Sequence, residues 1–294
     1  MNGINYIIDA HLHLWEKQDG MINGLPVKDL GSGRSSFLGE ARQMMPAYID
    51  DGKNTAERLL GNMDYARVNA CAVTQEYMDG NQDEYLLRVR KKYPDRFRVC
   101  SLYEEKPDYR TEGFDGVKIC ASRLKDKDLK KLLPVFKDIE KRDMYVSIDL
   151  ADGDEQTDDM QYLIDRCPSL RIAVGHFGMV TTKGWQKQIK LAKNENVYIE
   201  SGGLTWLFNR EYYPFPSAID AVREAIGICG VKKLMWGSDY PRTMTEITYK
   251  MAMRFILETP KLSLEEKRAF LGENAKEFFR FGPLERLPEI PNML

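Results

Sequence analysis

The chain alternates short apolar runs with longer amphipathic segments, and this alternation restricts the possible folds more than any other feature. Eight runs resemble buried β-strands; they span Tyr6–Ala10, Asn69–Val73, Phe97–Leu102, Gly116–Cys120, Met144–Leu150, Arg171–Gly175, Val197–Ser201 and Lys233–Gly237. The segments between them have helical spacing, most clearly over Thr55–Ala66, Gln82–Tyr93, Asp128–Lys141, Gln156–Arg166, Trp185–Ala192 and Ser217–Ile228. Strands that alternate with helices pair in parallel and connect through right-handed crossovers.

Eight such units in about 250 residues predict an α/β fold, a (β/α)8 TIM barrel in a single domain. The alternative is an open parallel sheet, but the first run is not followed by the GxGxxG motif of a dinucleotide-binding sheet. We therefore expect the barrel to span residues 1–281. The remaining residues, 282–294, form a tail that we expect to pack on the barrel or on a neighbouring subunit.

Charge and composition exclude several classes of protein. The 294 residues carry a net charge of −2, which gives no reason to expect nucleic acid as a partner. No apolar run reaches the roughly 20 residues that cross a bilayer, and no signal peptide is recognisable, so we expect no membrane association. The five cysteines are widely spaced and contain no CxxC pair, which favours reduced thiols in a cytoplasmic compartment.

Two irregular inserts interrupt the pattern, Glu16–Asp51 after the first strand and Gly202–Pro216 after the seventh. In a barrel both would lie at the carboxyl ends of the strands, where catalytic loops gather. Long loops without regular structure in a compact domain are usually lids or binding loops, and surface padding is the alternative.

The three histidines of the chain all follow apolar strands. His11 and His13 form an HxH at the end of the first strand, and alternate residues of a strand point the same way, so both imidazoles can converge. His176 follows the sixth strand and Asp239 the eighth. Each residue alone has a structural explanation, such as a hydrogen-bonded histidine or a helix-capping aspartate. Together they occupy the mouth of one barrel, which favours an active site.

The motifs DAHLHLW, GHFG and WGSDYPR resemble those of the first, sixth and eighth strands of the amidohydrolase-related (amidohydrolase 2) barrel hydrolases. The closing segment Leu271–Phe279 is also similar to the end of that family, and the resemblance covers about residues 7–281. It implies that His11 and His13 bind a divalent metal, zinc or manganese, and that Asp239 is a ligand or the general base. It also implies that His176 polarises a carbonyl or transfers a proton.

The fifth strand departs from this family. Many members have a metal-binding histidine there, whereas this chain has Asp149. A carboxylate can bind zinc or manganese, so a site of two histidines and two aspartates is feasible. Relatives that resemble pyrone dicarboxylate lactonases lack that histidine and work without metal. Asp149 could therefore bind metal or substrate, or hydrogen-bond to the barrel wall.

Further residues near the predicted mouth are candidates for binding substrate. Lys118 alternates inward on the fourth strand, where it can contact an anion or pair with Asp149 or Asp239. Arg123 and Arg242 follow the fourth and eighth strands and could hold a carboxylate. Trp15 and Trp206 could wall the pocket, with core packing as the alternative.

These observations predict a hydrolase of a small carboxylated or sugar-derived molecule, such as a lactone, that uses a metal-activated or aspartate-activated water. The closest alternative is a decarboxylase or hydratase of an unsaturated acid at the same site. A barrel that binds a metabolite without catalysis is the alternative from another class. The expected partner is a small-molecule substrate, and a homo-oligomer is possible.

Overall fold

In the computed structural model, which describes residues 3–106 and 108–291, the eight expected strands form one parallel sheet in sequence order. The strands are β1 (Ile8–His13), β7 (Ala70–Thr74), β8 (Phe97–Leu102), β9 (Gly116–Cys120), β10 (Tyr145–Asp149), β11 (Arg171–Val174), β12 (Val197–Glu200) and β13 (Leu234–Met235). The sheet closes because β1 also meets the segment after β13. Leu12 forms a parallel bridge with Tyr240, and the Ala10 amide donates to the Trp236 carbonyl at 2.9 Å. The chain is therefore a (β/α)8 barrel and not an open sheet.

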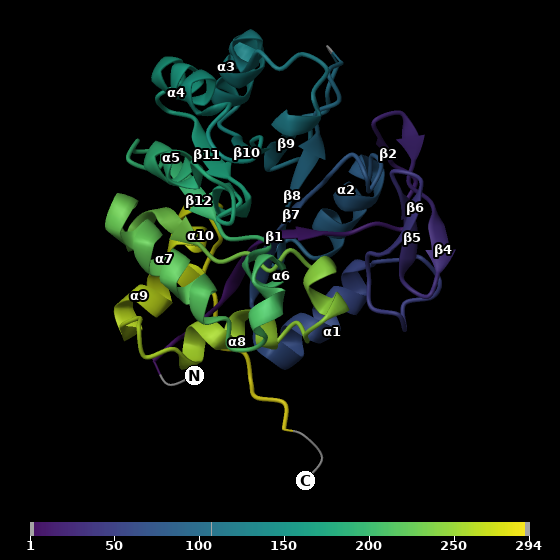
Figure 1. Cartoon of the computed structure of the whole chain (residues 1–294), viewed down its shortest axis with the longest axis vertical. Helices are drawn as coiled ribbons and strands as arrows, with labels where there is room; N and C mark the ends of the chain where they lie inside the picture. Colours follow the sequence, from purple (N-terminus) through teal and green to yellow (C-terminus); the bar gives the residue numbers. More distant parts are fainter. Residues whose placement is uncertain (1–2, 107, 292–294) are drawn as a thin grey trace.

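Helices surround the barrel (Figure 1). They are α1 (Ala56–Ala66), α2 (Asp83–Lys92), α3 (Leu133–Lys141), α4 (Thr157–Arg166), α5 (Trp185–Leu191), α7 (Pro216–Cys229), α8 (Met251–Glu258), α9 (Leu264–Arg268) and α10 (Asn274–Phe278). All six expected helical segments form helices, although the third begins as a 3₁₀ turn over Leu129–Leu132. In the crossover between β8 and β9, the described residues, 103–106 and 108–115, form no helix. A capping box at Ser263 and Glu266 starts α9.

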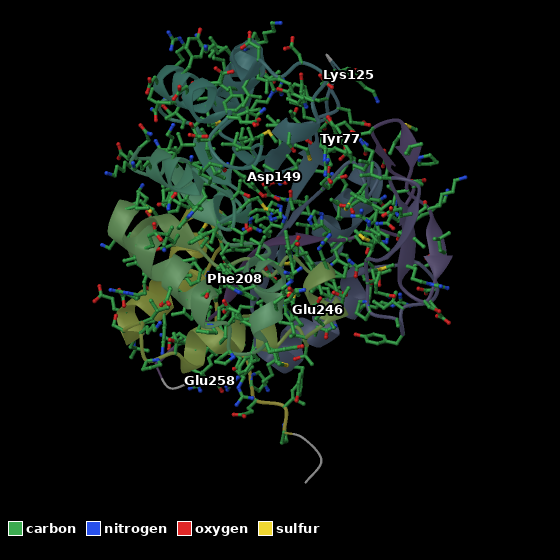
Figure 2. The ribbon with its side chains drawn as sticks, in the orientation of Figure 1. Tyr77, Lys125, Asp149, Phe208, Glu246 and Glu258 are labelled. Atoms are coloured by element: carbon green, nitrogen blue, oxygen red, sulfur yellow. The ribbon has the colours of Figure 1, made fainter. Side chains whose placement is uncertain are left out.

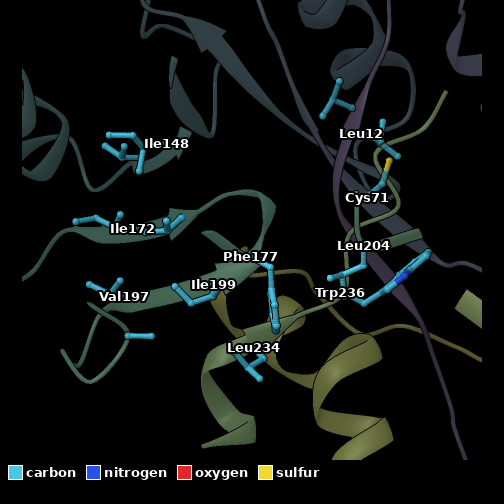
Figure 3. Packing of buried hydrophobic residues seen from close by; sticks show 14 of the residues in the cluster. Leu12, Cys71, Ile148, Ile172, Phe177, Val197, Ile199, Leu204, Leu234 and Trp236 are labelled. Carbon is cyan, nitrogen blue, oxygen red and sulfur yellow. The ribbon is translucent and has the colours of Figure 1, made fainter. Parts of the chain in front are cut away.

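Apolar side chains fill two spaces, one outside the strands and one inside. The outward residues Ile148, Ile172 and Ile199 are fully buried on successive strands (Figure 3). Inside the barrel, small residues of β1, β7 and β11 surround Tyr145, and two aromatic rings at the carboxyl end of α10 pack against it; this inner group includes Ala10, Ala70, Ala72, Ala173, Phe278 and Phe279. The amino-terminal end of the barrel is thus packed shut, and the polar chemistry is left to the other end.

Both inserts differ from the irregular loops expected. The first forms a two-stranded sheet of β2 (Met21–Ile22) and β3 (Leu25–Pro26) and a three-stranded sheet of β4 (Asp29–Gly31), β5 (Arg34–Phe37) and β6 (Glu40–Gln43). These strands lie at one edge of the molecule (Figure 1). The second insert contains α6 (Leu204–Leu207). Elements of two to four residues are too short to show periodicity in the sequence, which is why they were not expected.

The tail contacts the barrel where it is described. The Asn69 side chain donates to the Glu285 carbonyl at 2.6 Å, and Leu284 packs partly buried against the inner apolar group. Residues 292–294 of the predicted tail lie outside the described residues. Among the described residues, no helix combines the length and the apolar character needed to cross a membrane. The cysteines are free thiols, and four of the five are buried.

Candidate active site

A β-bulge in β1 turns both histidines of the HxH into the barrel. Ile8 and Ala10 face the interior, so strict alternation would point His11 outward. The pairing of β1 with β7 shifts register between Asp9 and Leu12, which inserts one extra residue and resets the phase. The imidazoles then converge, with their Nε2 atoms 3.2 Å apart. The convergence expected from the sequence is observed, but it depends on this bulge.

A buried carboxylate holds the outer nitrogen of each imidazole. His11 Nδ1 lies 2.7 Å from Oε1 of Glu200, and His13 Nδ1 lies 2.8 Å from Oδ2 of Asp79. When each Nδ1–H donates to its carboxylate, the two Nε2 lone pairs face each other. Histidines that bind metal commonly have this arrangement, because the carboxylate fixes the tautomer and strengthens the donor nitrogen.

Asp239 completes a triangle with the two imidazoles. Its Oδ1 lies 3.6 Å from His11 Nε2 and 3.4 Å from His13 Nε2. A tetrahedral ion with bonds of about 2.0–2.1 Å keeps its ligand atoms about 3.3–3.4 Å apart. The three edges of this triangle, 3.2, 3.4 and 3.6 Å, bracket that spacing. His11, His13 and Asp239 therefore fit one divalent ion.

The charges around the triangle also favour a cation. Burial lowers the pKa of His11 and keeps its imidazole neutral, which is the form that binds metal. Burial also lowers the pKa of His13, but Asp79 and Asp239 outweigh that effect and raise it to about 10. Burial alone would raise the pKa of Asp239, yet His13 and His176 hold it well below its ordinary value. Three carboxylates, those of Asp79, Glu200 and Asp239, thus surround two imidazoles and attract positive charge.

His176 enters the site from the end of β11. Its Nδ1 donates to the Gly202 carbonyl at 3.0 Å, so its Nε2 points to Asp149, whose Oδ2 lies 3.6 Å away. Burial lowers the pKa of His176, but Asp149 reverses this and raises it to about 9. Gly175 makes the approach possible, since a Cβ there would lie 2.1 Å from Asp149 Oδ1. His176 is therefore a protonated imidazole beside the triangle at neutral pH.

Asp149 lies apart from the triangle and is paired with Lys118. The Lys118 ammonium is fully buried and its Nζ lies 2.6 Å from Asp149 Oδ1. Burial raises the pKa of Asp149, but Lys118 lowers it far more, so the carboxylate stays ionised. Asp149 can join a second group of ligands with His11 and His176. The two histidines and two aspartates predicted from the sequence are thus divided between two groups that share His11. Figure 2 shows Asp149 near the middle of the molecule.

A cavity of about 230 Å³ opens over this cluster. His13, His176, Asp149 and Asp239 line it together with all the predicted substrate-binding residues except one; these are Trp15, Arg123, Trp206 and Arg242. The exception, Lys118, lies behind Asp149 and does not line the cavity. Phe37 and Met44 reach the cavity from the first insert. The insert therefore contributes to the pocket wall, as a binding loop would.

Three buried carboxylates in or beside the site were assigned no role from the sequence. Glu200 accepts hydrogen bonds from His11 Nδ1, from the Gly202 amide at 2.6 Å and from the His176 amide at 3.0 Å. Asp9 accepts from the Ser238 amide and the Tyr249 hydroxyl, both at 2.8 Å, and so ties β1 to the segment after β13. Glu200 ends an apolar run and Asp9 lies within one, which were usable signals. Asp79 lies in a loop, and nothing in its surroundings distinguishes it.

Comparison with known proteins identifies a family and a set of similar folds. Residues 8–281 match the model of a protein family described as Amidohydrolase. No curated protein sequence matches the chain significantly.

Among solved structures, the chain is similar to a probable 2-pyrone-4,6-dicarboxylic acid hydrolase from Acinetobacter baumannii with citric acid bound. The TM-score is 0.68 and the identity 21%, over 94% of this chain and 99% of that one. An amidohydrolase from Burkholderia multivorans with bound zinc has a TM-score of 0.68 and 16% identity, over 94% and 100% of the two chains. The 4-oxalomesaconate hydratase from Rhodopseudomonas palustris has a TM-score of 0.53 and 15% identity, over 76% and 80%. At these identities the likeness shows the fold.

Proposed function

Because the chain belongs to the amidohydrolase family, we propose that it hydrolyses an ester or lactone bond in a small carboxylated or sugar-derived molecule. The observation that carries this proposal is the triangle of His11, His13 and Asp239, which faces the same cavity as the His176 imidazole. Hydrolysis needs a water nucleophile, a group that takes its proton and a group that stabilises charge on the carbonyl oxygen. Each of these has a candidate in this cavity.

We propose that His11, His13 and Asp239 hold one divalent ion, zinc or manganese. When bound, such an ion supplies Lewis-acid chemistry that acidifies water and polarises a carbonyl. Glu200 and Asp79 accept from the two Nδ1–H groups and so aim both Nε2 atoms at one point, where a bound cation would take the place of the second His13 proton. The zinc bound to the similar Burkholderia multivorans amidohydrolase agrees with this proposal.

Asp239 and His176 are suited to opposite proton transfers. The pKa of Asp239 is lowered and that of His176 is raised to about 9, so at neutral pH one is a carboxylate and the other an imidazolium. Pairs of groups whose environments drive their pKa values apart are typical acid–base assignments. We propose that Asp239 Oδ1 takes the proton of the attacking water. His176 Nε2–H then stabilises the carbonyl oxygen or protonates the leaving oxygen.

The remaining cavity residues fit an anionic substrate with an apolar body. Arg123 and Arg242 offer guanidinium groups that can bind a carboxylate in a bidentate manner, and Trp15 and Trp206 offer flat apolar walls. Arg242 lies 4.7 Å over the Trp206 ring, which leaves its polar edge free for a carboxylate. Lys118 acts through Asp149, because it reaches neither the cavity nor a substrate in it.

We further propose a cytoplasmic location and a homo-oligomer.

The test is a panel of lactones and unsaturated dicarboxylic acids, assayed with protein purified without chelator and with protein stripped and reloaded with zinc or manganese. Lactone opening that requires the metal would support the proposal. Turnover of unsaturated acids alone would instead favour a hydratase or decarboxylase at the same site. Lactone opening that is unaffected by stripping would show a metal-free mechanism and contradict the proposed ligand set.

A further inference from the structure

Trp206 makes a direct hydrogen bond to the carboxylate at the centre of the site. Its indole Nε1 donates to Asp239 Oδ2 at 2.6 Å, which is short for a nitrogen donor and typical of a charged acceptor. Oδ2 is the oxygen that does not face the histidines, since Oδ1 is the atom within 3.6 Å of both Nε2 atoms. Trp206 therefore holds one oxygen of Asp239 and leaves the other to the triangle.

We propose that Trp206 is a positioning residue that fixes the orientation of the Asp239 carboxylate, so that Oδ1 alone serves the metal and the attacking water. This inference rests on the proposed metal site. A pocket wall needs only the flat ring of Trp206, whereas this role uses its indole N–H group.

Asp239 needs such a partner because little else holds its side chain. It lies beyond the end of β13, and its backbone has φ +57°, a left-handed conformation that is unusual for aspartate. Its amide is held by the His11 carbonyl at 2.9 Å, but among the described residues the Trp206 indole is the one donor to its carboxylate besides the histidines. A carboxylate without that donor can rotate about its Cβ–Cγ bond and exchange its two oxygens. The indole removes this freedom before any ligand binds.

The second insert is built around this ring. Gly203 has φ +87°, and a Cβ there would lie 2.5 Å from indole atom Cε2, so only glycine lets the ring lie against the backbone. The Arg242 guanidinium also lies over this ring, 4.7 Å from its centre. The Thr205 and Thr243 hydroxyls, 2.7 Å apart, join α6 to the turn that follows Asp239. These contacts fix the indole relative to the segment that carries the carboxylate.

A wall residue and a positioning residue respond differently to loss of the indole N–H. Trp206→Phe keeps an aromatic ring under Arg242 and removes the donor. If Trp206 only walls the pocket, this change alters substrate affinity and leaves metal binding intact. If it positions Asp239, metal binding weakens although no ligand has changed. Loss of such supporting contacts typically costs 10–100-fold in metal affinity.

The experiment measures zinc affinity of the whole chain by competition with a chromogenic chelator, in the absence of substrate. Trp206→Phe is expected to weaken zinc binding 10–100-fold and to lower kcat with a smaller change in KM. The matched control is Trp185→Phe, a buried tryptophan that packs on Phe177 outside the cavity, and its zinc affinity is expected to equal the parent's. Gly203→Ala pushes the indole away without changing Trp206 and is expected to weaken zinc binding as well.

The outcomes separate this inference from the function on which it rests. A parent protein that binds no zinc refutes the metal site and the inference together. A parent that binds zinc, with Trp206→Phe within twofold of it, refutes the inference alone. Thermal unfolding of the metal-free variants is measured in parallel. A Trp206→Phe protein that unfolds far below the Trp185→Phe control would show a general structural role and would also overturn the inference.

Discussion

Asp239 is a corner of the triangle, the proposed general base and the acceptor of the Trp206 N–H. Replacing it by asparagine exchanges one carboxylate oxygen for an amide nitrogen. The asparagine carbonyl can still accept the Trp206 N–H, now 2.6 Å from Oδ2. Its amide nitrogen then takes the place of Oδ1, 3.4 Å from His13 Nε2 and 3.6 Å from His11 Nε2. At neutral pH His11 Nε2 is unprotonated and can accept from the new N–H group. His13 donates to Asp239 in the parent; without the carboxylate that helps to raise its pKa, it can lose its second proton and accept as well. The substitution therefore keeps the local hydrogen bonds and removes the carboxylate.

The expected effects on stability and on catalysis are very different in size. Because the Trp206 hydrogen bond is kept, and both imidazoles can accept from the new N–H group once His13 has lost its second proton, the metal-free fold should change by only about 1 kcal/mol. Loss of a general base typically costs 10²- to 10⁴-fold in rate, equivalent to about 2.7–5.5 kcal/mol of transition-state stabilisation. Loss of a ligand should reduce zinc affinity at least as much as the 10–100-fold typical of supporting residues.

The assay is kcat/KM on the best substrate of the panel, with zinc content and thermal unfolding measured on the same preparations. The matched control is Asp83→Asn, a buried aspartate that accepts hydrogen bonds from Gln75 and the Leu102 amide outside the cavity, and its turnover should equal the parent's. Asp239→Asn with kcat/KM within threefold of the parent would refute the role of Asp239. A large loss of stability in the metal-free variant would refute the hydrogen-bond argument.

Three further predictions concern the groups around Asp149. In the proposed mechanism His176 acts as the imidazolium, so kcat/KM should fall as the pH rises through about 9, and Asp149→Asn should move that alkaline limb to lower pH because Asp149 raises this pKa; a limb that stays in place would exclude His176 as the acid. Lys118→Met should destabilise the fold by about 3–5 kcal/mol in chemical denaturation, since it leaves the ionised Asp149 without its buried partner. A loss of stability of less than about 1 kcal/mol would show that the ion pair contributes little. Gly175→Ala places a methyl group 2.1 Å from Asp149 Oδ1 and 2.7 Å from Glu200 Oε1, so it should greatly reduce kcat and also weaken zinc binding through His11; parental kcat and zinc affinity would show that both carboxylates can move away freely.

The sequence predicted most of the fold because periodicity is a local property. Each of the eight strands and each of the six expected helices has a pattern long enough to be recognised, and their alternation implies a parallel barrel. The strands of the first insert were not predicted because each has only two to four residues, too few to show a periodic pattern. No helical segment was expected between Leu102 and Gly116, and the described residues of that crossover, 103–106 and 108–115, form no helix.

The sequence by itself also determined which side chains gather at the carboxyl ends of the strands, because every parallel strand ends at the same face of a barrel. His11, His13, His176 and Asp239 could be identified in this way. Only the tertiary structure decided how these groups are divided. A register shift in β1 turns His11 inward, Lys118 neutralises Asp149 instead of reaching the cavity, and Trp206 holds the far oxygen of Asp239. Each of these outcomes depends on distances between residues far apart in the chain, and such distances are set by packing rather than by local pattern.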